Sequence, residues 1–194
     1  MKGLLKILLA FVLPCGLIIV GAFGLFKIFK KRKERKKRNM EITKEKGWKY
    51  FTLEELDTRK NKDVEIDAQH LANLDNLVTK VLDPLREKYG KPIHVNSGLR
   101  DFVPEGGSTT SDHKLGCAVD VEGGGRTDKE NKELAELLLS MNLPFTQLIN
   151  EFGFSWLHIA LNPKDSRKRL TRSTGDRKKP IYVQCGTDKT KWLA

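Results

Sequence analysis

Apolar residues recur at helical spacing between residues 67 and 89. They fall three or four positions apart, which predicts an amphipathic helix with one buried face. Pro84 lies inside the stretch and has no backbone N–H, so we expect it to kink or divide the helix. Gly90 ends the pattern. The apolar positions are Leu71, Leu74, Leu77, Val78, Val81, Leu82 and Leu85.

Shorter patterns predict the remaining elements of the folded part, which begins near Trp48. Thr52–Glu55 and Thr127–Glu130 are capping boxes, each of which predicts the start of a helix. The second helix continues to about Met141. The predicted strands are residues 92–98, 145–151, 156–161 and 181–183, and the second and third of these are joined at Gly153.

The N-terminus carries the longest apolar run. Residues 7–26 contain no charge and are long enough to span a bilayer as a helix. Nine Lys and Arg follow between Lys27 and Arg38. We therefore predict a transmembrane anchor (residues 1–27), a basic juxtamembrane linker (28–47) and a single-pass membrane protein. A cleaved signal peptide is disfavoured because no A-x-A cleavage site precedes the basic run. A lipoprotein signal at Cys15 is disfavoured because Pro14, not a small residue, precedes the cysteine.

Charge is distributed very unevenly along the chain, whose net charge is +11. Residues 1–40 contribute +10 and residues 162–194 contribute +7, which leaves −6 for residues 41–161. A nucleic-acid-binding domain usually carries positive charge on its folded face, so no specific nucleic acid is expected as a partner. The basic run could bind anionic headgroups or wall polymers. The alternative is a solvated juxtamembrane linker.

The chain has three widely spaced cysteines and only four histidines. The cysteines predict no disulfide framework, and Cys117 is expected to be a small buried residue. His113 and Asp120 stand seven positions apart across Gly116, and His158 lies on a predicted strand. These residue types suit zinc, although such spacing alone is common.

A resemblance to a known family supports these three residues as zinc ligands. Ser111–Asp120, which has the form Ser-x-His-x-x-Gly-x-Ala-x-Asp, resembles the signature of the zinc D-Ala-D-Ala carboxypeptidase family. Gly90–Arg100 and Trp156–Ala160 are similar to that family's Ser-Gly-Tyr-Arg turn and closing strand. The resemblance covers a zinc peptidase domain of residues 48–170 and leaves a basic C-terminal extension, residues 171–194, unexplained. It implies an α+β fold, shared with the hedgehog signalling domain, in which helices pack on a small antiparallel sheet.

The resemblance also implies roles for single residues. His113, Asp120 and His158 would bind Zn²⁺. Arg100 would stabilise the oxyanion or hold the substrate carboxylate, and Ser111 would contact the substrate backbone. The alternatives are a surface salt bridge for Arg100 and a turn-stabilising hydroxyl for Ser111.

The general base is less well defined by the sequence. Many members of the family carry an Asp or Glu three residues before the last His, but Ser155 occupies that position here. Glu151 is the best replacement, provided that the strand register places it near the metal rather than a cross-strand away. The alternatives are a Glu paired with a neighbouring cation, and Asp112 as the base.

The predicted function is a zinc peptidase that cuts peptidoglycan stem peptides next to a D-amino acid, as in phage lysis or entry. The alternative is a catalytically weak zinc-containing module of the same fold that binds the wall. The predicted orientation and the predicted substrate disagree. The positive-inside rule places the domain in the cytoplasm, whereas the wall lies outside the membrane.

Overall fold

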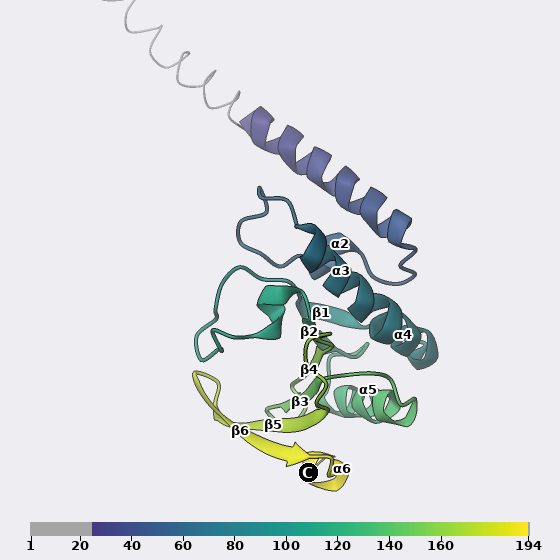
Figure 1. Cartoon of the computed structure of the whole chain (residues 1–194), viewed down its shortest axis with the longest axis vertical. Coiled ribbons are helices and arrows are strands. Elements are labelled where there is room, and N and C mark those ends of the chain that lie inside the picture. The colour runs from purple at the N-terminus through teal and green to yellow at the C-terminus, as the bar shows by residue number, and fades with distance from the viewer. Residues whose placement is uncertain (1–24, 194) are drawn as a thin grey trace, which may run out of the picture. The chain divides into compact units, whose positions relative to one another are not determined.

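The computed structural model describes residues 25–193 (Figure 1). The chain divides into two compact units, residues 1–42 and 43–194. In the first unit, residues 25–42 are helical. The second unit contains the sheet, the remaining helices and every predicted site residue.

The predicted single-pass membrane location is contradicted. Among residues 25–193, no helix is both long enough and apolar enough to cross a bilayer. The helical segment that begins at residue 25 consists largely of Lys, Arg and Glu, whose transfer into hydrocarbon is costly. Most of the apolar run, residues 7–24, lies outside the described residues.

Six strands of the second unit form one sheet in the order β1-β2-β4-β3-β5-β6. All neighbouring strands are antiparallel except β3 and β5, which are parallel. The expected antiparallel sheet is therefore a mixed sheet. Both sides of β4 are occupied, by β2 and β3, so β5 reverses direction and joins the free side of β3. The strands are β1 His94–Ser97, β2 Ala118–Glu122, β3 Gln147–Glu151, β4 Trp156–Ala160, β5 Arg169–Asp176 and β6 Lys179–Gly186.

The helices follow the predicted starts. Thr52 caps α2 through a complete capping box, and the Thr127 hydroxyl accepts a hydrogen bond from the Glu130 amide at the start of α5. The long amphipathic stretch divides near Pro84, as predicted, with a π-helical turn before the second segment. The described helices are α2 Leu53–Leu56, α3 Ala68–Leu77, η1 Val78–Leu82, α4 Asp83–Tyr89, η2 Asp112–Leu115, α5 Asp128–Ser140 and α6 Lys189–Leu193.

The two faces of the sheet differ in polarity because side chains alternate along each strand. One face presents fully buried Val119, Leu148 and Leu157 to the core, where they join the buried leucines of α3, α4 and α5. In Figure 1, α4 and α5 lie on the same side of the sheet. Asp120 and His158 point to the opposite face, so the helices leave that face available for a site.

The C-terminal segment belongs to the same sheet. The predicted boundary at residue 170 falls inside β5, and β6 and α6 continue the fold to residue 193. The indole of Trp192 is completely buried and donates to the carbonyl of Thr171 on β5 at 2.7 Å. This hydrogen bond fixes the last helix to the strand next to β3.

Candidate metal centre

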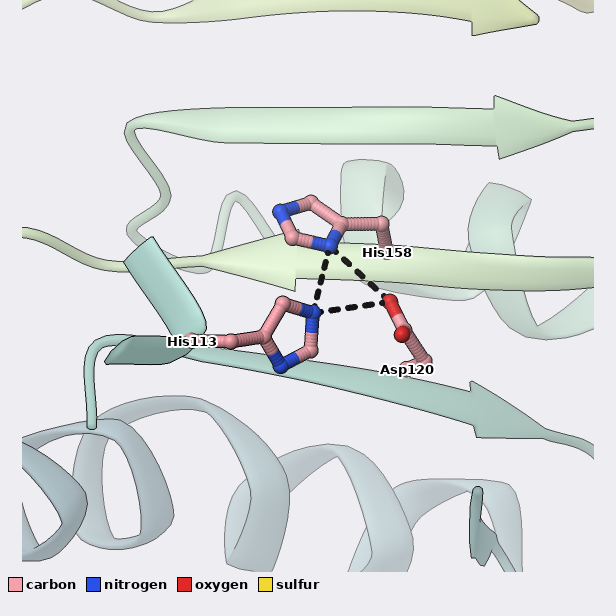
Figure 2. Close-up of side chains that lie close together, drawn as sticks. All are labelled: His113, Asp120 and His158. Carbon is pink, nitrogen blue, oxygen red and sulfur yellow. Dashed lines mark hydrogen bonds and ion pairs between the residues drawn. The ribbon is translucent and has the colours of Figure 1, made fainter. Parts of the chain in front are cut away.

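Three separate elements bring His113, Asp120 and His158 together (Figure 2). Asp120 on β2 is the direct cross-strand partner of His158 on β4, so both side chains project from the same face. His113 comes from η2, which ends at Gly116 in the left-handed region with a φ of 69°. A Cβ at Gly116 would lie 2.9 Å from the carbonyl oxygen of His70, so this turn requires glycine.

The donor atoms of these side chains converge on one point. His113 Nε2 lies 3.1 Å from Asp120 Oδ1 and 3.1 Å from His158 Nδ1. His158 Nδ1 lies 2.9 Å from Asp120 Oδ1. The cluster is also protected from solvent, since His113 is only 1% exposed. These three residues form a group that could hold a metal ion.

The backbone determines which nitrogen of His113 faces this point. His113 Nδ1 lies 2.8 Å from the carbonyl oxygen of Gly98, which can only accept a hydrogen bond. Nδ1 therefore carries the proton, and in the neutral ring Nε2 presents its lone pair to the cluster. This hydrogen bond also fixes the ring orientation, as the outer partners of metal-binding histidines do.

The cluster fits a zinc ion. Tetrahedral zinc, with bonds of about 2.0–2.2 Å to nitrogen and oxygen, separates its ligand atoms by roughly 3.4 Å. The donor atoms here are a few tenths of an ångström closer than that. Two imidazoles and one carboxylate are a common zinc set and leave a fourth position for water or substrate.

Replacing Gly98 by Ala is expected to destabilise the fold. A Cβ at this position would lie 2.2 Å from the carbonyl oxygen of Leu56, which is backbone and cannot move aside. We expect a loss of about 2–3 kcal/mol in the free energy of unfolding, measured by urea denaturation. Gly124→Ala is the matched control, because its nearest contact is the Lys91 side chain at 3.3 Å. Equal stability of the two variants would contradict the prediction.

The charges around Asp120 favour its ionised form. Burial alone would raise the pKa of Asp120, but the adjacent His113 and His158 outweigh it and hold the pKa well below its ordinary value. Arg100 Nη1 lies 3.9 Å from Asp120 Oδ2, and Arg100 Nη2 donates to the Ser111 hydroxyl at 3.2 Å. Arg100 and Ser111, both proposed to contact substrate, therefore lie beside the metal cluster.

Glu151 lies on the same face of the sheet. The register places Ile149, not Glu151, directly opposite His158, and Glu151 pairs with Trp156 two residues farther along β3. Glu151 and His158 still share one face and one cavity, and the charges of His158 and Asp120 act on the Glu151 carboxylate. Glu151 is 5% exposed, and one of its oxygens accepts a hydrogen bond from the Ser173 hydroxyl. Burial raises the pKa of Glu151 above its ordinary value, even though Ser173 and His158 act in the opposite direction. A raised pKa is typical of a carboxylate that acts as a base near neutral pH.

Glu151→Gln is expected to stabilise the metal-free protein at neutral pH. Because the folded pKa of Glu151 exceeds its ordinary value of 4.5, the contribution of Glu151 to the stability of the wild type is largest below that value and is lost as the pH rises through the folded pKa. The glutamine variant has no such loss. Thermal unfolding should therefore show a higher midpoint for the variant at about pH 8 and no difference at about pH 4. The exposed Glu136→Gln is the control, and a gain of equal size at both pH values would contradict the burial argument.

A cavity of about 890 Å³ opens beside the cluster. Asp112, the alternative base, also borders it, but its Oδ1 accepts a hydrogen bond from Asn162 at 2.7 Å. Several wall residues from β5, β6 and their connection were not predicted from the sequence, since only the pairing of β5 with β3 brings them to the site. They are Arg169, Thr171, Arg177, Tyr182 and Gln184.

Two imidazoles and a carboxylate that meet at a cavity, with a second buried carboxylate alongside, form an arrangement that can serve a single-metal hydrolase. The chain belongs to the peptidase M15 family, because the model of that family matches residues 49–160, more than half of its length. The resemblance to zinc D-Ala-D-Ala carboxypeptidases is thereby confirmed. A comparison with curated proteins found no match.

Family membership supports a zinc-dependent metallopeptidase. The match contains His113, Asp120 and His158, as well as Glu151, and it ends before β5 begins. The cluster and the proposed base therefore lie in the segment that identifies the family, while one wall of the cavity lies beyond it.

Proposed function

We propose that this protein is a zinc-dependent peptidase that cleaves peptidoglycan stem peptides next to a D-amino acid. The observation that carries the proposal is the position of Glu151, a buried carboxylate beside a His-Asp-His cluster in one cavity. A module that only bound a metal for stability would need the cluster and would gain nothing from a second buried carboxylate, whose desolvation is costly.

The ligand atoms would be His113 Nε2, Asp120 Oδ1 and His158 Nδ1. When bound, zinc acts as a Lewis acid and lowers the pKa of water to about 7. Hydrolysis adds water across the peptide bond, so one proton must leave the attacking water and one must reach the departing nitrogen. Glu151 would accept the first proton and deliver it to that nitrogen, acting in turn as base and acid.

Arg100 would act on the other side of the cluster. Its guanidinium is largely buried and is held by Ser97 and Ser111, with Nη–Oγ distances of 3.5 and 3.2 Å. Burial lowers its pKa from the ordinary value, whereas the charge of Asp120 raises it. A fixed, desolvated cation at this position suits an oxygen that becomes negative during the reaction, or a substrate carboxylate.

The direct test is digestion of purified peptidoglycan and isolated muropeptides by the zinc-loaded protein. We expect mass spectrometry to show peptide products that differ from their parents by one added water, with the new terminus next to a D-amino acid. A chelator should abolish the products and added zinc should restore them. Binding to the wall without any release of products would instead identify a binding module of the same fold.

A further inference from the structure

Ser173 lies directly behind the proposed base. It occupies the middle of β5 and is the register partner of Glu151 on β3 and of Tyr182 on β6. Its side chain is 1% exposed, so water does not compete for its hydroxyl. Ser173 lies outside residues 49–160, the segment that matches the family.

The hydroxyl of Ser173 makes two hydrogen bonds. It accepts from the backbone N–H of Phe152 at 3.0 Å, and its own proton points to Oε2 of Glu151. When Glu151 is ionised, only Ser173 can supply the proton of the second bond. Among the described residues, Oε1 of Glu151 has no hydrogen-bond partner. One carboxylate oxygen is therefore anchored, and the other is available to the cavity.

We propose that Ser173 is a positioning residue that holds the carboxylate of Glu151 by Oε2 and so directs Oε1 toward the substrate. This inference rests on the proposed function, in which Glu151 is the base. It assigns β5, a strand beyond the family match, to the catalytic machinery. A carboxylate that transfers protons needs a fixed direction, because proton transfer requires hydrogen-bond geometry at the reacting atom.

Other charged or titratable groups act on Glu151 from the neighbouring strands. His158 on β4 lowers the pKa of Glu151, and Asp120 on β2 raises it. Tyr182 on β6 stays neutral, because burial and the charges of Glu151 and Asp120 raise its pKa to about 12. Ser173 differs from these groups in acting through a direct hydrogen bond to the ionised form, which lowers the pKa of Glu151.

The test compares Ser173→Ala with Ser155→Ala. The Ser155 hydroxyl donates to the carbonyl of Phe152 at 3.1 Å, so both variants lose a contact to the same turn. Ser155 bonds Glu151 only through the backbone, which the substitution retains, whereas the Ser173 hydroxyl bonds the Glu151 carboxylate. We expect Ser173→Ala to lower kcat/KM by about 10-fold to 100-fold, the size typical of outer hydrogen-bond partners. The acidic limb of its pH profile should move to higher pH. Ser155→Ala should leave that limb unchanged.

A second readout needs neither metal nor activity. Carbon-13 NMR of the metal-free protein, labelled at glutamate side chains, follows the titration of Glu151 directly. Its pKa should rise in Ser173→Ala and not in Ser155→Ala. Ser173→Thr keeps the hydroxyl and suits a strand, so it should restore both the pKa and the rate, and it serves as the second variant if Ser173→Ala fails to fold.

Each outcome decides one question. An unchanged pKa of Glu151 in Ser173→Ala overturns the inference. A raised pKa with an unmoved acidic limb also overturns it, since Ser173 would then be a structural neighbour only, although the peptidase would stand. Absence of hydrolysis by the wild type overturns the proposed function and with it the catalytic role of Ser173, while the NMR titration still decides whether Ser173 holds the carboxylate.

Discussion

Glu151→Gln is expected to lower kcat for wall peptides by about 10²-fold to 10⁴-fold, the usual contribution of a general base. The amide has nearly the shape of the carboxylate but cannot accept the proton from the attacking water. The three proposed zinc ligands are unchanged, so the zinc content should remain at one ion per chain. Activity and metal content are measured on the same preparation, which separates loss of the base from loss of the metal.

Glu122→Gln is the matched control for this experiment. Glu122 lies on β2, on the sheet face that carries Asp120, but it pairs with Arg126 at 3.4 Å and is not among the residues that line the cavity. Its replacement should leave kcat within about twofold of the wild type, since exposed ion pairs contribute little. An active Glu151→Gln protein would remove Glu151 as the base and direct attention to Asp112.

His113→Ala is expected to weaken zinc binding by more than about a hundredfold. Loss of an outer partner of a metal ligand costs about 10-fold to 100-fold in affinity, and His113 is proposed as a direct ligand. The variant keeps only Asp120 and His158, too few for a closed tetrahedral set. Competition with a coloured chelator measures the affinity, and hydrolysis should fall to background at limiting zinc.

His94→Ala controls for the loss of an imidazole. His94 bonds the carbonyl of Gly124 at 3.1 Å and has no contact with the cluster. Zinc should raise the thermal unfolding midpoint of the wild type and of His94→Ala, because a ligand that binds only the folded state stabilises it. The midpoint of His113→Ala should not respond. A normal zinc response in His113→Ala would contradict the proposed ligand set.

Local patterns predicted much of the fold and the metal cluster. The capping residues Thr52 and Thr127 mark helix starts because they satisfy first-turn amides within a few positions of themselves. The motif from Ser111 to Asp120 is equally local. Its spacing alone is common, and the resemblance of the whole motif to the zinc peptidase signature is what named His113 and Asp120 as ligands.

The register between paired strands could not be predicted in the same way. The position of Glu151 depends on the turn that joins β3 to β4, where Phe152, Gly153 and Phe154 all have positive φ. Phe rarely adopts this conformation, and here a hydrogen bond of 2.6 Å from the Phe154 amide to Asn150 supports it. No sequence pattern predicts positive φ at these two Phe residues. The resulting turn determines the register between β3 and β4.

The role of the C-terminal segment also depended on long-range pairing. From composition it resembled a basic extension, because residues 171–194 contain six Lys and Arg and only two Asp. In the fold, its alternate residues reach the cavity only because β5 pairs in parallel with β3. The membrane prediction is contradicted because no helix among residues 25–193 is both long and apolar enough to cross a bilayer.

The anchoring of Trp192 to the carbonyl of Thr171 has a practical consequence for anyone who shortens or tags this chain. Thr171 is two residues from Ser173, so α6 braces the strand that carries the proposed positioning residue. A fragment trimmed to residues 49–160 would retain all the features by which the family is recognised and would lack that brace. If Ser173 positions the base as proposed, hydrolysis would require β5 and α6 in addition to the segment that matches the family, and the shorter fragment would be inactive.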